Sequence, residues 1–193
     1  MEKIIAQDDL IINDKKCNDF VHNESNDDLK KSFIDKLDVE SVNLCQIREL
    51  NLFCMGCCGH DYGSRDKLER AIDNNTQTYN EAKDKKLWGQ RSPNYVHTSG
   101  VCYNVIRKGN EVFCPLHPLR NKGIDLRDKD CDINYMCLTY KTYLKWDLGK
   151  RKRFIIFLSL KSRDWYEYSM GMDSDSILNE FENLEQKNNF QEK

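Results

Sequence analysis

The sequence lacks any long apolar run, and this absence excludes two classes of protein. Its longest uninterrupted apolar stretch, Phe154 to Leu158, is far shorter than the ~20 residues that a membrane-spanning helix needs. The first residues, MEKIIAQDDL, also contain no continuous apolar segment of the kind that a secretory signal peptide carries. We therefore expect a protein with no membrane partner that works in the cytoplasm.

An excess of charge of one sign is also missing. The 30 basic and 32 acidic residues give a formal net charge of -2 at pH 7, so no global positive field attracts nucleic acid. One short run, Lys150 to Arg153, is entirely basic, which is more typical of a solvated helix end than of a phosphate site. Single-stranded nucleic acid binds where aromatic side chains stack beside basic residues, and Tyr143, Trp146 and Trp165 are such side chains near this run in the sequence. Nucleic acid is therefore an unlikely partner, but one that the sequence does not exclude.

Apolar residues are few for a chain of 193 residues, 39%, and nine of them are cysteines. A polar chain often gains stability from a bound metal or a cross-link, because either one reduces the demand on its core. Cytoplasmic thiols stay reduced, so clustered cysteines indicate metal ligands or catalytic groups before they indicate disulfides. The odd number of cysteines also argues against a fully paired disulfide framework.

Residue patterns predict a mainly α-helical fold with one short β-hairpin, an α+β fold being the alternative. The turn residues Lys108 to Asn110 place the hairpin between Val101 and Cys114. Two strands alone are marginal in water, so we expect a small, irregular, cysteine-rich core stapled by a metal. Apolar residues at helical spacing predict helices over 29–37, 39–53, 65–87 (with an Asp66/Glu69 capping box), 130–146 (ended by Gly149), 154–165 and from 174 onward.

The domain organisation follows from the polarity of the two ends. Residues 1–40 are expected to form a polar, partly helical N-terminal segment. Residues 41–185 are expected to form a single cysteine-cluster domain, and residues 186–193 a polar tail that frays.

Seven of the nine cysteines lie between residues 54 and 137, and they carry the strongest functional signal. Cys54 and Cys57 have Cys-x-x-Cys spacing, which lets a tight turn point both sulfurs at one ion, and Gly56 eases that turn. Cys58 follows directly and can serve the same ion or an adjacent one. Cys17 and Cys45 lie outside this group and have no close neighbours in the sequence.

The second half of the group mixes sulfur and nitrogen ligands. Cys114 and His117 repeat the two-residue gap, and the predicted hairpin places Cys102 almost opposite Cys114. Cys131 and Cys137 are six residues apart, so on one continuous helix they would point about 240° apart. Both can reach one site only if Cys131 precedes the start of the helix.

Seven thiols and one imidazole would fill two tetrahedral zinc sites. Four thiolates can instead hold a [4Fe-4S] cluster, although the spacing fits neither a ferredoxin run nor a standard zinc ribbon. Disulfides or inert buried thiols are the remaining interpretation. The predicted metal ligands are Cys54, Cys57, Cys58, Cys102, Cys114, His117, Cys131 and Cys137.

The segment from Cys54 to Pro118 resembles the cysteine-cluster proteins described as zinc- or iron-chelating domains. The resemblance is carried by CMGCC at 54–58, by Cys102 and by CPLHP at 114–118. That family usually has one more cysteine upstream of the first run, which this sequence lacks. The resemblance covers about a third of the chain, and it implies metal binding without a defined reaction.

The function that these residues favour is a cytoplasmic metal-binding protein with zinc in a mainly structural role, open to a protein partner. An iron–sulfur protein with a redox or radical-associated role and a nucleic-acid-binding zinc protein are the alternatives. An enzyme would use zinc-activated water or a thiolate such as Cys58, with His60, Asp61 or His97 handling protons.

Overall fold

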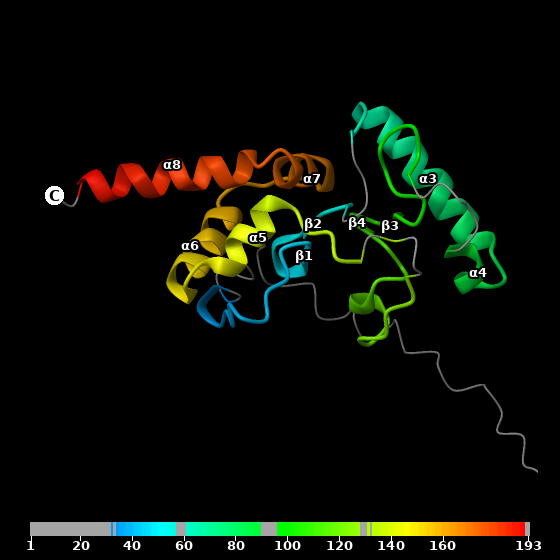
Figure 1. The fold of residues 1–193 in the computed structure, drawn as a ribbon, viewed down its shortest axis with the longest axis horizontal. Helices are drawn as coiled ribbons and strands as arrows, with labels where there is room; N and C mark the ends of the chain where they lie inside the picture. Colours follow the sequence, from blue (N-terminus) through cyan, green and yellow to red (C-terminus); the bar gives the residue numbers. More distant parts are fainter. Residues whose placement is uncertain are drawn as a thin grey trace, which may run out of the picture. The chain divides into compact units, whose positions relative to one another are not determined.

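The computed structural model of the protein describes residues 32, 34–56, 61–89, 96–127, 131 and 133–191 (Figure 1). The chain divides into two compact units, Met1–Lys36 and Leu37–Lys193. Most of the helix expected over 29–37 lies outside the described residues. Within Leu37–Lys193 the described elements are mainly helices, with two small antiparallel hairpins, so the predicted fold class of helices plus a short hairpin is confirmed.

The first hairpin occupies a segment predicted to be a helix over 39–53, and that prediction is wrong. Strand β1 (Gln46–Ile47) pairs with β2 (Leu52–Phe53) across the 3-10 helix η1 (Arg48–Leu50). The chain reverses through Asn51, whose φ of 54° is left-handed, a conformation that asparagine tolerates better than most residues. Short apolar segments fit a helix or a strand equally well, and here tertiary contacts decide.

The second hairpin confirms the predicted one, although its first strand is shorter. Strand β3 (Ile106–Lys108) pairs with β4 (Glu111–Phe113), and Gly109 has the positive φ of 59° that favours glycine in a tight turn. Upstream of β3, Cys102 forms only an isolated bridge with Val96. The hairpin packs on α3 (Arg65–Glu81), and Val112 is fully buried.

Helix α3 ends earlier than the predicted limit of residue 87. A new helix, α4 (Lys85–Gly89), begins because the Asp84 carboxylate accepts hydrogen bonds from the N–H groups of Lys86 and Leu87, each at 2.9 Å. The predicted Asp66/Glu69 capping box is not formed, because the N-cap of α3 is Ser64, whose side chain makes no capping bond, and Asp66 lies inside the first turn. Glu69 instead forms an ion pair with Arg65 at 3.0 Å.

Four helices complete the chain: α5 (Leu138–Lys145), α6 (Leu148–Ser159), α7 (Trp165–Asp173) and α8 (Ser176–Gln191). The helix predicted from residue 130 begins only at Leu138. Gly149 lies inside α6 rather than ending a helix, because Asp147 caps α6 by accepting from Lys150 N at 2.9 Å. Helix α8 continues into the segment predicted as a polar tail.

Apolar packing, not a set of cysteines, forms the core of the described residues. One cluster joins β2, α3 and the second hairpin, and its only cysteine is Cys102. The other joins α5, α6 and α8 through aromatic rings whose centroids lie 5.0–6.2 Å apart, formed by Tyr143, Trp146, Phe154, Phe157 and Phe181. The predicted metal-stapled core is therefore not supported. Tyr143 and Trp146, predicted as stacking side chains for nucleic acid, are part of this packing, and Trp165 is buried in the first cluster.

None of the helices in the described ranges combines the length and the apolar character that crossing a bilayer requires.

Candidate metal site

Cys45 and Cys54 are cross-strand neighbours at the open end of the first hairpin. The ladder pairs Gln46 with Phe53, so the next pair outward is Cys45 with Cys54. The Cys54 N–H donates to the Cys45 carbonyl at 2.9 Å, which continues the ladder by one hydrogen bond. Residues directly opposite each other in an antiparallel pair send their side chains to the same face of the sheet. The two thiols are thus brought together by the strand register.

Helix α7 holds this cysteine pair from both sides. The Tyr168 hydroxyl donates to the carbonyl of Leu44 at 2.7 Å, one residue before Cys45. The Ser169 hydroxyl accepts from the N–H of Met55 at 2.9 Å, one residue after Cys54. A capping box fixes the start of α7, and Tyr168 and Ser169 are both buried. Two residues of α7, Tyr168 and Ser169, therefore position the pair.

The two hairpins meet through Gln46. Its side-chain amide donates to the carbonyl of Val112 at 3.0 Å, and β2 contacts β4. Because Cys114 follows β4 directly, this contact brings Cys114 to the same region as Cys45 and Cys54. The arrangement depends on a hydrogen bond from a side chain to a backbone carbonyl, between Gln46 and Val112, which are 66 residues apart in the chain.

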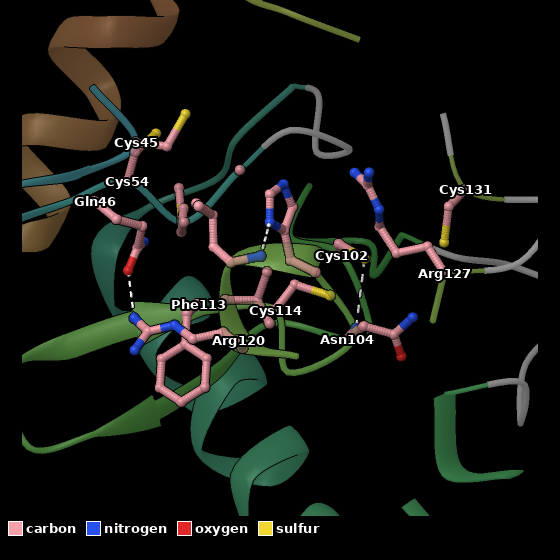
Figure 2. Close-up of a pocket in the computed structure, with 15 residues that line it drawn as sticks. Cys45, Gln46, Cys54, Cys102, Asn104, Phe113, Cys114, Arg120, Arg127 and Cys131 are labelled. Carbon is pink, nitrogen blue, oxygen red and sulfur yellow. Dashed lines mark hydrogen bonds between the residues drawn. The ribbon is translucent and has the colours of Figure 1, made fainter. Parts of the chain in front are cut away.

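A pocket lies between these segments, and its lining collects cysteines from four parts of the chain (Figure 2). In this view Cys45 and Cys54 lie at one end, Cys131 at the other, and Cys114 between them. The cavity volume is about 50 Å³, which leaves room for an ion or a few water molecules. We call this cavity the cysteine pocket. The cysteines and the histidine that line it are Cys45, Cys54, Cys102, Cys114, Cys131 and His117.

A second hollow shares Cys45 and Cys54 with the cysteine pocket and adds Cys137, the N-cap of α5. Burial raises the pKa of the Tyr168 hydroxyl well above its ordinary value, and the Cys54, Cys45 and Cys137 thiolates raise it further. The Cys45–Cys54 pair stands at the boundary of the two hollows.

His117 is held in one tautomer by the backbone. Its Nδ1 accepts a hydrogen bond from Leu119 N at 3.2 Å and so caps the 3-10 helix η2 (Pro118–Arg120). Burial lowers the pKa of His117, and the Arg127 charge lowers it further, so the ring is neutral with its proton on Nε2. A metal at Nε2 would require the opposite tautomer and would break this cap. His117 is therefore a weaker candidate ligand than the thiols around it.

Arg127 supplies positive charge to both hollows. Its side chain is only 9% exposed and forms a two-pronged ion pair with Asp125, with N···O distances of 2.6 and 2.9 Å. The hydrogen bonds from Arg127 hold the pKa of Asp125 at about 2, below its ordinary 3.8. A guanidinium beside cysteine thiols favours their thiolate form and offsets the negative charge of a metal–thiolate centre.

His97, a predicted proton-transfer group, forms part of the support of Cys102. The Asn75 amide nitrogen donates to the carbonyls of Cys102 and Val105, at 3.1 and 2.9 Å, which turns its oxygen toward His97 Nε2 at 2.9 Å. An amide oxygen only accepts, so His97 Nε2 carries a proton in this contact. His60, Cys57 and Cys58 lie outside the described residues.

The predicted ligands divide into three groups. Cys54, Cys102, Cys114, Cys131 and His117 line one pocket; Cys137 lines the adjoining hollow; Cys57 and Cys58 lie outside the described residues. Among the described side chains, no group of three or more His, Cys, Asp or Glu is arranged to hold one metal ion.

Two predictions about ligand positions have different outcomes. Continuing the register of β3 and β4 places Val105, not Cys102, opposite Cys114, so that prediction is wrong because the hairpin is shorter than expected. Cys131 does precede the helix that begins after Cys137, as the spacing required. Cys45 was not among the predicted ligands, because only the first hairpin, which was not predicted, brings Cys45 near Cys54.

The basic run at the start of α6 is engaged within the protein. Lys150 forms an ion pair with Glu182 at 2.8 Å, and Arg153 forms one with Glu185 at 2.7 Å. Arg151 donates to three carbonyls at the end of α5, those of Tyr143 and Trp146 at 3.1 Å and that of Leu144. These contacts tie α5 and α8 to α6 and favour the helix-end interpretation of the run over a phosphate site.

Comparisons with protein-family models, curated proteins and solved structures find no significant match. The resemblance of Cys54 to Pro118 to chelating cysteine-cluster proteins remains a prediction.

Proposed function

We propose that the protein binds a zinc ion through thiolates of the cysteine pocket, and that the ion has a structural role. The single observation that carries the proposal is convergence: five cysteines, spread from residue 45 to residue 131, line one small cavity. Thiolates are strong ligands for zinc, which takes four of them in structural sites. Chance burial of thiols explains single cysteines well but explains five at one cavity poorly.

The surroundings of the pocket also support a metal–thiolate centre. A zinc ion with four thiolates carries a net charge of -2, which is costly to bury without a counter-charge. Arg127 and Arg120 both line the pocket, and because each is already paired with a carboxylate, Asp125 at 2.6 Å and Glu111 at 3.0 Å, they offset only part of that charge. Side chains must turn to coordinate an ion, since the described groups do not already form a three-ligand set.

A [4Fe-4S] cluster is the second candidate, because five cysteines at one cavity exceed the four thiolates that such a cluster needs. The two candidates differ in colour and composition. A zinc protein is colourless, whereas an iron–sulfur protein absorbs visible light.

The test is elemental analysis and an absorption spectrum of anaerobically purified full-length protein. We expect stoichiometric zinc and no visible absorption, with the zinc lost in Cys114→Ser and retained in Cys17→Ser, a cysteine distant in sequence from the group. Brown protein containing iron and sulfide would favour the second candidate. Protein without bound metal that also takes up none on reconstitution would overturn both.

A further inference from the structure

We infer that Cys45 is a metal ligand, and that Cys45 and Cys54 form an anchored thiol pair for a soft divalent ion such as Zn²⁺ or Cd²⁺. The inference rests on the proposed function and deepens it, because it names the part of the site that is built before the ion arrives. It also assigns a ligand that sequence spacing excluded.

The strand register sets a separation that suits a shared ion. Opposed residues in an antiparallel pair have Cβ atoms ~4.5–5.5 Å apart, with the longer values at hydrogen-bonded pairs. Cys54 N–H donates to Cys45 O at 2.9 Å, whereas Cys45 N–H donates to Asn43 Oδ1 at 2.9 Å, so the pair makes one of the two bonds of a hydrogen-bonded strand pair. With Zn–S bonds of about 2.3 Å, a tetrahedral ion requires sulfurs about 3.8 Å apart. Side chains on this frame reach that separation by rotating about χ1.

A disulfide is the competing use of the same frame. It requires Cα atoms about 4.4–6.8 Å apart and Cβ atoms about 3.5–4.5 Å apart, and opposed strand residues lie within or close to both ranges. Under reducing conditions the two thiols remain available to an ion.

Helix α7 resists movement of the pair. Tyr168 fixes the carbonyl of Leu44, and Ser169 fixes the N–H of Met55, at 2.7 and 2.9 Å. These bonds flank the two cysteines and come from adjacent residues of one helix. Groups that hold ligands in place in this way strengthen metal binding, and their loss typically costs ~10–100-fold in affinity. Tyr168 and Ser169 are positioning residues of the pair.

The location of the pair offers further thiols for the coordination. Cys45 and Cys54 line both hollows, and Cys114 lines one of these hollows while Cys137 lines the other. Two thiolates supply half of a tetrahedral shell, and thiols recruited from either hollow supply the rest. The pair is the fixed half of the site.

The first test compares zinc affinity of full-length variants by competition with a chromophoric chelator. We expect Cys45→Ser to bind Zn²⁺ at least about tenfold more weakly than the wild type, and Cys17→Ser to bind it as tightly. Unchanged affinity in Cys45→Ser would overturn the inference and leave the proposed function intact. A wild-type protein that binds no Zn²⁺ would overturn both.

A matched pair of tyrosine variants tests the positioning role. Tyr168→Phe and Tyr143→Phe each remove one buried hydroxyl that donates to a backbone carbonyl, of Leu44 and of Val39 respectively. We expect Zn²⁺ affinity to fall only in Tyr168→Phe. Equal affinities in the two variants would contradict the positioning role.

Thiol protection tests the pair without any substitution, so it does not depend on a variant that folds. Wild-type protein is alkylated with iodoacetamide in the presence of Zn²⁺ or of a chelator, and each cysteine is quantified by mass spectrometry. We expect Zn²⁺ to slow alkylation of Cys45 and Cys54 but not of Cys17. Alkylation of Cys45 at the same rate in both conditions would overturn the inference.

Discussion

Replacing Ser169 by alanine tests how α7 supports the hairpin that carries the cysteine pair. In the structure the Ser169 hydroxyl accepts from Met55 N at 2.9 Å and donates to the carbonyl of Trp165 at 2.6 Å. Ser169 is 2% exposed and Met55 3%, so water does not replace the lost acceptor. The substitution leaves a buried N–H group without a partner.

The magnitude follows from two opposing contributions. An unsatisfied buried donor costs ~1–3 kcal/mol. Alanine has the better helix propensity, which returns up to ~0.5 kcal/mol. We therefore expect Ser169→Ala to lower the free energy of unfolding by ~0.5–3 kcal/mol.

Ser174→Ala is the matched control. Ser174 follows α7 and also donates to the carbonyl four residues earlier, of Met170 at 2.7 Å, but it is exposed and holds no strand. Urea unfolding followed by far-UV circular dichroism gives both free energies, and the slope with urea should be the same in both variants. If Ser169→Ala lies within about 0.5 kcal/mol of Ser174→Ala, the support argument is wrong.

Three further predictions concern packing, electrostatics and the role of the metal. A Cβ on Gly171 would lie 2.5 Å from Ile177 Cδ1, so Gly171→Ala should overpack the α7–α8 contact. We expect it to lower the free energy of unfolding in urea by ~1–3 kcal/mol. At Gly63 the atom nearest to an added Cβ is 3.5 Å away, so Gly63→Ala is the control that should be tolerated. NMR titration of the carboxyl groups should give Asp125 a pKa of about 2, rising toward 3.8 in Arg127→Met. The Arg127–Asp125 pair stabilises the fold above pH 3.8 and loses this effect as the pH falls toward 2. An unchanged pKa of Asp125 in the variant would refute the pairing. Chelation of bound metal should lower the thermal midpoint but preserve most of the helical signal at room temperature, because aromatic packing holds α5, α6 and α8 together; complete loss of that signal would show that the metal holds the whole fold.

The parts of the fold that were predicted from the sequence are those fixed by local chemistry. Gly109 marks the turn of the second hairpin, and the apolar spacing after Ser64 marks α3. The ends of the helices were harder to predict, because several residues along the chain can each cap a helix. Asp84 starts a new helix where the apolar pattern alone continues the old one.

The first hairpin could not be predicted, because its determinants are far away in the sequence. Its two strands are fixed by Tyr168 and Ser169, at separations of 124 and 114 residues. Cys45 was left out of the predicted site for the same reason. The ion pairs of Lys150 and Arg153 likewise involve residues 32 positions away, beyond any local charge pattern.

X-ray absorption spectroscopy of the zinc-loaded, full-length protein tests the central claim most directly, because it reports the atoms bound to the metal. The account predicts a shell dominated by sulfur at about 2.3 Å, and a lower number of sulfur ligands in Cys45→Ser. A shell of nitrogen and oxygen alone at ~2.0–2.1 Å would contradict it.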